Sequence, residues 1–230
     1  MTGLRERKKQ RTRDALLLAA HQLFVDHGYD ATTVDRIAER VEVSQRTFFR
    51  YFASKEEVAF HFHDVVEEVF VGSIVERPLD EAPYDVLRNA LDAAWTATAE
   101  AVEDVLPLRL HLMMWRTVET TPSLLAAHLR RQSAMEDRVS AEMAARTGLD
   151  PDLDPRPRVL VAAFCGVMRA AGRRWSCGPD LSVEAARSFA DSYVEHLAPA
   201  LGRDWGVQPR VPSPATSADP PKEAMPRPAG

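Results

Sequence analysis

The sequence predicts an all-α protein, in which an N-terminal three-helix domain with a helix-turn-helix precedes a larger C-terminal helical domain. Apolar residues recur at helical spacing through most of the chain, and no segment shows the alternation expected of a strand. Prolines and glycines fall where helices would end. The chain has 230 residues, of which 45% are hydrophobic, so it can bury a substantial core.

The first helix is expected over residues 11–27. Its apolar residues lie at helical spacing, and Gly28 stands where a C′ glycine would end the helix. Residues 1–10 precede this helix and are expected to form a basic, flexible arm.

Residues 32–55, TTVDRIAERVEVSQRTFFRYFASK, are typical of a helix-turn-helix. They predict two short helices, near 33–40 and 44–51, and a third helix that begins at Lys55. The second helix of this motif lies in the major groove of DNA. The layout therefore favours a DNA-binding regulator over an enzyme.

Capping residues support both short helices. Thr32 or Thr33 can cap the first helix by accepting a hydrogen bond from a free backbone N–H, and Ser44 can cap the second. Ser54 with Glu57 forms a capping box for the helix that follows.

The turn between the two short helices is Val41-Glu42-Val43. Such turns often hold glycine, because the backbone there needs a positive φ. A residue other than glycine in that conformation costs ~1 kcal/mol, which a well-packed domain can tolerate.

The rest of the chain predicts a series of helices bounded by prolines and glycines. Their expected ranges are 55–76, 84–103, 105–119, 122–148, 155–177 and 182–201.

The predicted organisation has four parts. After the arm comes a helix-turn-helix domain over 11–54, which extends to about residue 71 with the start of the next helix. A helical domain for effector binding and dimerisation covers 55–202. Residues 203–230 are rich in proline and poor in large apolar residues, so this tail is expected to be disordered.

The charge is unevenly distributed. Residues 1–55 hold eleven Lys and Arg against seven Asp and Glu, a net charge of +4. The remaining residues hold eighteen against twenty-seven, a net charge of −9. A basic N-terminal part on an acidic body suits a protein that offers one end to phosphates, and a frayed basic terminus could hold the same charges.

Cys165 and Cys177 are expected on one helix, ~18 Å apart along its axis, so they cannot pair. Reduced thiols suit a cytoplasmic protein. No apolar run approaches the ~20 residues needed to span a bilayer, and we expect no membrane association.

Metal-binding and catalytic patterns are weak. His61 and His63 are two apart on a predicted helix and lack the spacing of paired ligands. No nucleophile, P-loop or dinucleotide signature occurs. We therefore expect no metal, no cofactor and no enzyme activity.

Residues 11–55 resemble the DNA-binding domain of the tetracycline-repressor (TetR) family of bacterial regulators. The matching segments are AAHQLFVDHGYDATTVDRIAERV and VSQRTFFRYFASKEE. The remainder resembles the family in layout only. The resemblance implies an all-α fold with a helix-turn-helix domain and a C-terminal ligand-binding and dimerisation domain.

The resemblance also implies contacts with double-stranded DNA. The expected DNA-binding residues are Thr32, Thr33, Ser44, Gln45, Arg46, Thr47, Phe49, Arg50, Tyr51 and Lys55. Gln45, Arg46 and Thr47 stand where the family places base contacts. Arginine can bind guanine, and glutamine adenine, with two hydrogen bonds each.

Three further residues match family positions that hold phosphates: Thr33, Tyr51 and Lys55. Two positions depart from the family pattern. Phe49 replaces a usual tyrosine, so one phosphate-binding hydroxyl is absent, and Tyr51 replaces a usual histidine.

The last two helices are expected to form a homodimer interface. Ala162, Gly166 and Ala170 are spaced by four and make a stripe of small residues that a neighbouring helix can approach closely. A regulator that reads a palindromic operator needs two DNA-binding domains at a fixed spacing. Internal core packing is the alternative interpretation of the same stripe.

Aromatic residues and methionines in the helical domain suggest an effector pocket, although ordinary core packing would explain any one of them. The candidate pocket residues are Trp95, Arg109, His111, Met113, Met114, Trp115, Arg116, Phe164, Met168 and Trp175. Arg109 and Arg116 lie seven apart on one helical face, where they could receive an anionic head group or simply face solvent.

The leading hypothesis is a repressor that a small apolar or amphipathic effector releases from its operator. The wording FFRYFASK resembles an actinobacterial branch of the family, in which regulators of the mycofactocin locus sense long-chain acyl-coenzyme A. A fatty acyl compound or acyl-CoA is therefore one candidate effector. The alternatives are an effector-independent or architectural DNA-binding protein, a helical adaptor, and a small helical enzyme.

Overall fold

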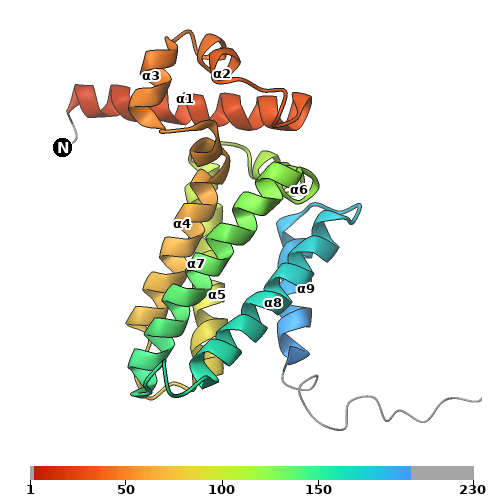
Figure 1. Ribbon diagram of the computed structural model, residues 1–230. Helices are drawn as coiled ribbons and strands as arrows, with labels where there is room; N and C mark the ends of the chain where they lie inside the picture. The colour runs from red at the N-terminus through yellow and green to blue at the C-terminus, as the bar shows by residue number, and fades with distance from the viewer. Residues whose placement is uncertain (1–2, 198–230) are drawn as a thin grey trace, which may run out of the picture.

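The computed structural model describes residues 3–197, and within them the chain is helical with no strand. The helices are α1 (Leu4–His27), α2 (Val34–Arg40), α3 (Gln45–Tyr51), α4 (Lys55–Glu76), α5 (Pro83–Glu103), α6 (Leu108–Thr120), α7 (Pro122–Thr147), α8 (Arg156–Ser176) and α9 (Val183–Glu195). Helices α1 to α3 form a layer across one end of the molecule, and α4 to α9 form the body below it (Figure 1). The predicted all-α class is confirmed.

Helix α1 begins at Leu4, seven residues earlier than predicted. The prediction of a flexible arm is therefore wrong for residues 4–10, which are the first two turns of a helix. Local pairs support these turns: Lys9 lies 3.5 Å from Glu6, and Gln10 donates to Asp14 at 2.7 Å. The predicted tail over 203–230 and the predicted end of the last helix at 201 lie outside the described residues.

The predicted caps form. Thr33 caps α2 by accepting from the Arg36 N–H at 3.2 Å, and Ser44 caps α3 by accepting from the Thr47 N–H at 3.1 Å. Ser54 caps α4 by accepting from the Glu57 N–H at 3.1 Å. These caps fix where each of the three helices starts, because each satisfies a backbone donor that the helix leaves unpaired.

The turn between α2 and α3 has the positive φ expected of it. Glu42 has a φ of 56°, and it is the only residue other than glycine with a positive φ in the part of the chain that the structure describes. The Glu42 N–H donates to Glu39 O at 3.0 Å, and the Val43 N–H donates to Ala38 O at 3.0 Å. This is a Schellman ending, in which the left-handed residue turns the chain from α2 into α3.

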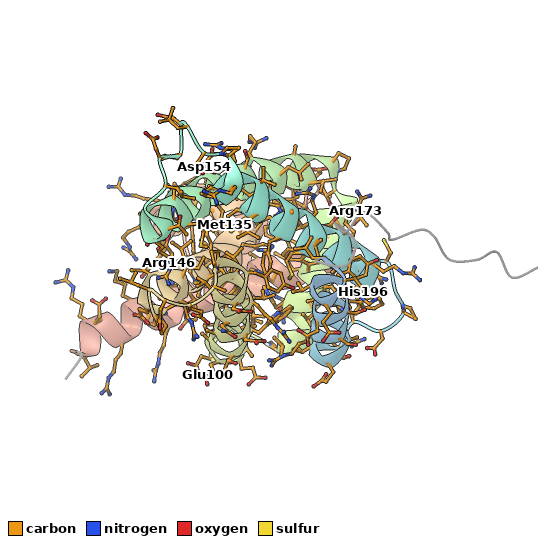
Figure 2. The ribbon with its side chains drawn as sticks, turned by 90° about the horizontal axis from the view of Figure 1, so that it is seen from below. Glu100, Met135, Arg146, Asp154, Arg173 and His196 are labelled. Atoms are coloured by element: carbon orange, nitrogen blue, oxygen red, sulfur yellow. The ribbon has the colours of Figure 1, made fainter. Side chains whose placement is uncertain are left out.

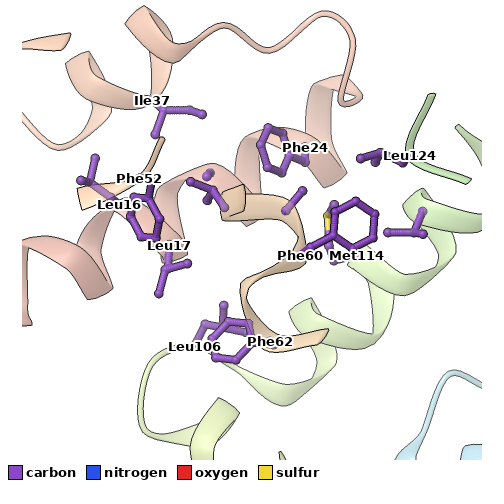
Figure 3. Close-up of a cluster of buried hydrophobic side chains, with 14 of the residues drawn as sticks. Leu16, Leu17, Phe24, Ile37, Phe52, Phe60, Phe62, Leu106, Met114 and Leu124 are labelled. Atoms are coloured by element: carbon purple, nitrogen blue, oxygen red, sulfur yellow. The ribbon is translucent and has the colours of Figure 1, made fainter. Parts of the chain in front are cut away.

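One apolar cluster joins the N-terminal layer to the body (Figure 3). It combines Leu16 and Phe24 of α1 and Ile37 of α2 with Phe60 of α4 and Met114 of α6, all of them buried. A second cluster fills the lower body between α4, α5, α7, α8 and α9. The three-helix layer therefore shares its core with the helices beneath it.

Candidate DNA-binding surface and ligand cavity

The first turn of α3 presents two polar side chains to solvent. Gln45 and Arg46 are exposed, and neither makes a hydrogen bond or ion pair with the described residues. Thr47 is half-buried, and its hydroxyl lies 2.9 Å from the Ser44 hydroxyl. The geometry therefore leaves Gln45 and Arg46 as the base-reading candidates, while Thr47 and Ser44 hold the start of the helix.

Aromatic residues flank this turn. Phe49 is 49% exposed and packs edge-on against the buried Phe48 ring at 5.4 Å. The Arg50 guanidinium lies 5.1 Å from the centroid of the Tyr51 ring. Arg50 and Tyr51 thus keep their polar ends at the surface, where phosphates could reach them, and Thr33 is exposed at the start of α2.

Thr32 does not belong to the DNA-binding surface. Its side chain is fully buried, and its hydroxyl donates to Gly28 O at 2.8 Å with Leu23 O at 3.1 Å. It therefore closes the end of α1 onto the α2 connection. The prediction that Thr32 contacts DNA is therefore wrong. A threonine beside a helix cap can point toward solvent or toward the core, and Thr32 points toward the core.

Lys55 is half-buried, and its ammonium is bound to carbonyls of the protein and does not extend toward a phosphate. Its ammonium donates to Tyr29 O and Thr32 O, each at 2.8 Å, and lies 4.0 Å from the centroid of the Tyr29 ring. Burial lowers the pKa of Lys55. The predicted phosphate contact conflicts with this geometry, which makes Lys55 the link between the helix-turn-helix domain and α4.

The body contains a cavity of about 290 Å³ between α4, α5, α6, α7, α8 and α9. Its lining is mostly apolar and aromatic. The lining residues are Phe60, His63, Asp64, Val66, Glu67, Phe70, Leu91, Ala94, Trp95, His111, Leu112, Trp115, His128, Arg131, Gln132, Met135, Phe164, Cys165, Met168, Arg169, Ala171, Gly172, Trp175, Ala186 and Ala190. Figure 2 looks into the body from below, with Met135 of α7 among the side chains between the helices.

Six of the ten predicted pocket residues line this cavity: Trp95, His111, Trp115, Phe164, Met168 and Trp175. They come from α5, α6 and α8, which the chain brings together from positions up to 80 residues apart. The sequence could mark these residues as large and apolar. Their convergence on one space depends on how the helices cross.

The other four predicted pocket residues lie elsewhere. Met114 is buried in the cluster that joins the two layers, Met113 is half-buried outside the cavity lining, and Arg109 is exposed. Arg116 donates to Ser176 O and Gly178 O, each at 2.7 Å. It therefore caps the end of α8, since lone carbonyls at a helix C-terminus accept from nearby cations.

The cavity also has a polar side that was not predicted from the sequence. His63 of α4 and His128, Arg131 and Gln132 of α7 all line it. Residues 128, 131, 132 and 135 share one helical face. The sequence did carry a sign of this polar side: the helical face that points inward contains polar residues, whereas the core faces of helices are normally apolar.

The unpaired polar atoms of the described residues gather at this cavity. Eight buried side-chain atoms lack a hydrogen-bond partner: His63 Nδ1 and Nε2, Trp95 Nε1, His111 Nδ1, Trp115 Nε1, Arg131 Nε, Gln132 Oε1 and Trp175 Nε1. Every one belongs to a residue of the lining. A buried polar group without a partner costs about 1–3 kcal/mol, so such a concentration is unusual for a plain core.

His63 lies at the centre of the aromatic part of the lining. Its ring stacks on Trp115, with centroids 4.7 Å apart and planes at 11°, and it meets His128 edge-on at 5.8 Å. Burial holds the pKa of His63 well below its usual value, with neighbouring His111 adding to the effect. The ring is therefore neutral and offers one N–H donor and one acceptor to the cavity.

The predicted dimer stripe is partly exposed. Ala162 and Ala170 face solvent, Gly166 is half-buried, and Val159 is 61% exposed. Helix α9 packs beside α8 (Figure 1). A strip of small and apolar residues along α8 is thus exposed, with Arg169 beside Gly166.

Among residues 3–197, no helix is long and apolar enough to cross a bilayer. The same residues contain no group of three or more His, Cys, Asp or Glu side chains placed to hold a metal ion. Cys165 is buried in α8 and Cys177 is exposed at its end, and neither forms a disulfide.

A helix-turn-helix domain with an exposed first turn, joined to a helical body that encloses a cavity, defines a DNA-binding transcriptional regulator. Two family models match the chain. One, described as bacterial regulatory proteins of the tetR family, covers residues 16–61, and the other, described as the MftR C-terminal domain, covers residues 81–198. The chain belongs to the TetR family.

Relatives agree with this assignment. The HTH-type transcriptional regulator TcmR of Streptomyces glaucescens is 43% identical over 203 residues, which span 88% of this chain and 90% of that protein. The HTH-type transcriptional activator FasR of Mycolicibacterium smegmatis is 42% identical over 199 residues, which span 80% and 84%. With the MftR-type C-terminal domain, they support the actinobacterial branch of the family.

The fold recurs in solved structures. The SmeT–triclosan complex superposes with a TM-score of 0.56 and 19% sequence identity, over 93% of this chain and 100% of that one. Regulators of the TetR family bind DNA operators, act as dimers and bind small-molecule effectors.

Proposed function

We propose that this protein is a repressor that binds a palindromic operator as a dimer and leaves it when a small molecule fills the cavity. The main observation behind the proposal is that all eight unpaired buried polar atoms of the described residues belong to side chains that line the cavity. A ligand that pairs with these atoms would stabilise the form of the protein that it binds. As a regulator of transcription, the protein would act in the cytoplasm, where the chromosome lies.

The lining indicates an effector with an apolar body and hydrogen-bond acceptors. Trp95, Trp115 and Trp175 each offer an unpaired indole N–H, and Arg131 offers an unpaired Nε–H. Aromatic and aliphatic side chains cover the remaining surface. A fatty acyl compound or acyl-CoA has this character, as do aromatic acids and phenols. SmeT shows that a molecule such as triclosan can be bound by a protein of this fold.

Operator recognition would depend on the first turn of α3. Gln45 and Arg46 are exposed there and able to reach base edges. A dimer formed through α8 and α9 would set two such turns in successive major grooves, about 34 Å apart. Phosphate contacts would come from Thr33, Arg50 and Tyr51.

Helix α4 would transmit the signal, since it lines the cavity and begins directly after the helix-turn-helix. Release requires that the effector binds better to the form in which the two DNA-binding domains are badly spaced. A ligand with equal affinity for both forms would shift nothing.

A gel shift with DNA upstream of the protein's own gene tests this function. We expect retention of that DNA over competitor DNA, and its release by an effector found in a thermal-shift screen. Arg46→Ala should lose about 1–3 kcal/mol of discrimination against unrelated DNA. Arg88→Ala, which removes an exposed arginine of α5, should leave it unchanged. Equal binding of all DNA by the wild-type protein would instead indicate an architectural DNA-binding protein.

A further inference from the structure

Four charged side chains line the cavity: Asp64 and Glu67 of α4, Arg131 of α7 and Arg169 of α8. Their formal charges cancel. Glu67 is already paired with Arg138, whose Nη1 lies 2.7 Å from its carboxylate. Arg131 differs from Arg169 in having a buried donor without a partner, its Nε, whereas Arg169 is 39% exposed and lies 3.8 Å from Glu136.

Arg131 is held in place by its other atoms. Its Nη1 donates to Asp64 Oδ1 at 2.6 Å, and its guanidinium lies 4.8 Å from the centroid of the Phe60 ring. Its Nη2 lies 3.7 Å from Glu56 in the first turn of α4. The guanidinium is therefore oriented before any ligand arrives, which reduces the entropy cost of binding.

Asp64 is a replaceable partner. Its side chain is 45% exposed, so it can turn into water if another anion takes its place. Ion pairs with this degree of exposure contribute little to stability. Burial also raises the pKa of Asp64, against the opposing effect of Arg131.

We propose that Arg131 binds the acidic head group of the effector in exchange for Asp64. The effector would be an organic acid with an apolar body. Its carboxylate would accept from Nε and Nη2 of Arg131, the two-bond geometry that arginine forms with carboxylates, and its charge would repel Asp64 from the adjacent Nη1. The apolar body would lie against the aromatic lining around Trp115 and His63. This assignment rests on the proposed function and puts the head-group site at Arg131, in place of Arg109 and Arg116.

The exchange would act on α4 at one end only. Four arginines of α7 tie it to α4: Arg130 and Arg131 near the DNA-binding domain, Arg138 in the middle and Arg146 at the far end. Arg146, labelled in Figure 2, donates to the Ile74 and Arg77 carbonyls at 3.0 Å each. Losing the Arg131–Asp64 pair would loosen this end of α4, while the Arg138 and Arg146 contacts hold the rest.

Calorimetric titration of the full chain at pH 7.5 tests the head-group site. Two matched pairs serve as probes: decanoic acid with 1-decanol, and 2-naphthoic acid with 2-naphthalenemethanol. We expect Arg131→Met to weaken binding of at least one acid about ten- to hundredfold, the effect of a lost charge-assisted hydrogen bond, and to leave its alcohol unchanged. Arg131→Lys, which keeps the charge without the two-bond geometry, should give a smaller loss.

Arg158→Met is the control, because it also removes an ion pair made with α7, the one to Asp137, and neither partner belongs to the cavity lining. It should leave the affinity for both probes of a pair unchanged. Asp64→Asn should bind the acid more tightly, since it removes the competing carboxylate. Equal losses for acid and alcohol, equal losses in the two methionine variants, or no gain in Asp64→Asn would overturn the proposal.

The two proposals fail separately. If an acid binds through Arg131 but saturating acid leaves the operator bound, the head-group site stands and effector-released repression is wrong. If neither acid binds the wild-type protein and another molecule releases the operator, the repressor function stands and the Arg131 site is wrong.

Discussion

The ammonium group of Lys55 lies 4.0 Å from the centroid of the Tyr29 ring and donates to the Tyr29 carbonyl at 2.8 Å. With the second bond, to Thr32 O, it fastens the loop after α1 to the first residue of α4. Any force that moves α4 therefore acts directly on the helix-turn-helix domain.

Lys55→Met should lower the free energy of unfolding by roughly 2–3 kcal/mol, because it leaves two carbonyls without a charged donor and removes the contact with the Tyr29 ring. Urea denaturation measures this loss. The dependence of operator affinity on salt separates this role from a phosphate contact. A phosphate-binding lysine would reduce the slope of log K against log [salt] by about 0.9, whereas we expect no change in slope for Lys55→Met.

Glu42→Gly should stabilise the protein by up to about 1 kcal/mol. Glu42 has a φ of 56°, which strains a residue with a side chain and suits glycine. Ala141→Gly, at an exposed position inside α7, is the control and should destabilise by about 1 kcal/mol. If both glycine variants lose stability equally, the turn is not strained.

Stability should fall in mild acid, in part because of His21. This side chain is buried, and its Nδ1–H donates to Leu17 O at 2.9 Å. Burial lowers the pKa of His21 from 6.5 to about 4, with the Leu17 bond opposing the shift. The unfolded chain therefore takes up a proton as the pH falls below 6.5, while the folded chain takes it up only near pH 4.

The contribution of His21 is thus complete above pH 6.5 and is lost as the pH falls toward 4. Between pH 7.5 and pH 5 we expect this histidine alone to cost roughly 2 kcal/mol of unfolding free energy. In His21→Leu that part of the pH dependence should disappear from denaturation midpoints. His27→Leu, at an exposed position, should keep it.

Ala170→Glu should break the proposed dimer, since it would place like charges on the exposed strip of α8. Sedimentation should then show a monomer with an intact helical signal and weaker binding to a palindromic operator. Ala145→Glu puts the same charge on an exposed position of α7 and should remain dimeric. A dimeric Ala170→Glu protein would move the interface away from this strip.

The helices could be predicted closely because the residues next to each helix end determine where that helix begins or ends. Ser44, Ser54 and Gly148 act within a few residues of where they stand, so their effects do not depend on the rest of the fold. The start of α1 was missed for a related reason. Its first turns carry no apolar stripe. Arginine and lysine have good helix propensity, but a run of them at a terminus is also typical of a disordered arm.

The cavity could be predicted only in part, because lining it and filling the core use the same residue types. Met168 reaches the cavity and Met114 fills the shared cluster, yet both are methionines on amphipathic helices. Which of the two positions a methionine takes, in the cavity lining or in the core, depends on how the helices cross. Arg131 was overlooked since a polar residue facing inward is exceptional, and only a partner such as Asp64, 67 residues away, explains it.

The apolar cluster shared by α1, α2, α4 and α6 has a consequence for folding. A fragment that stops before α4 would expose Phe24 and Ile37 to water and lack the side chains that cover them. We expect the DNA-reading layer and the upper body to melt in a single calorimetric transition. A substitution that destabilises the cavity-forming helices would then lower the melting temperature of the helix-turn-helix domain by the same amount.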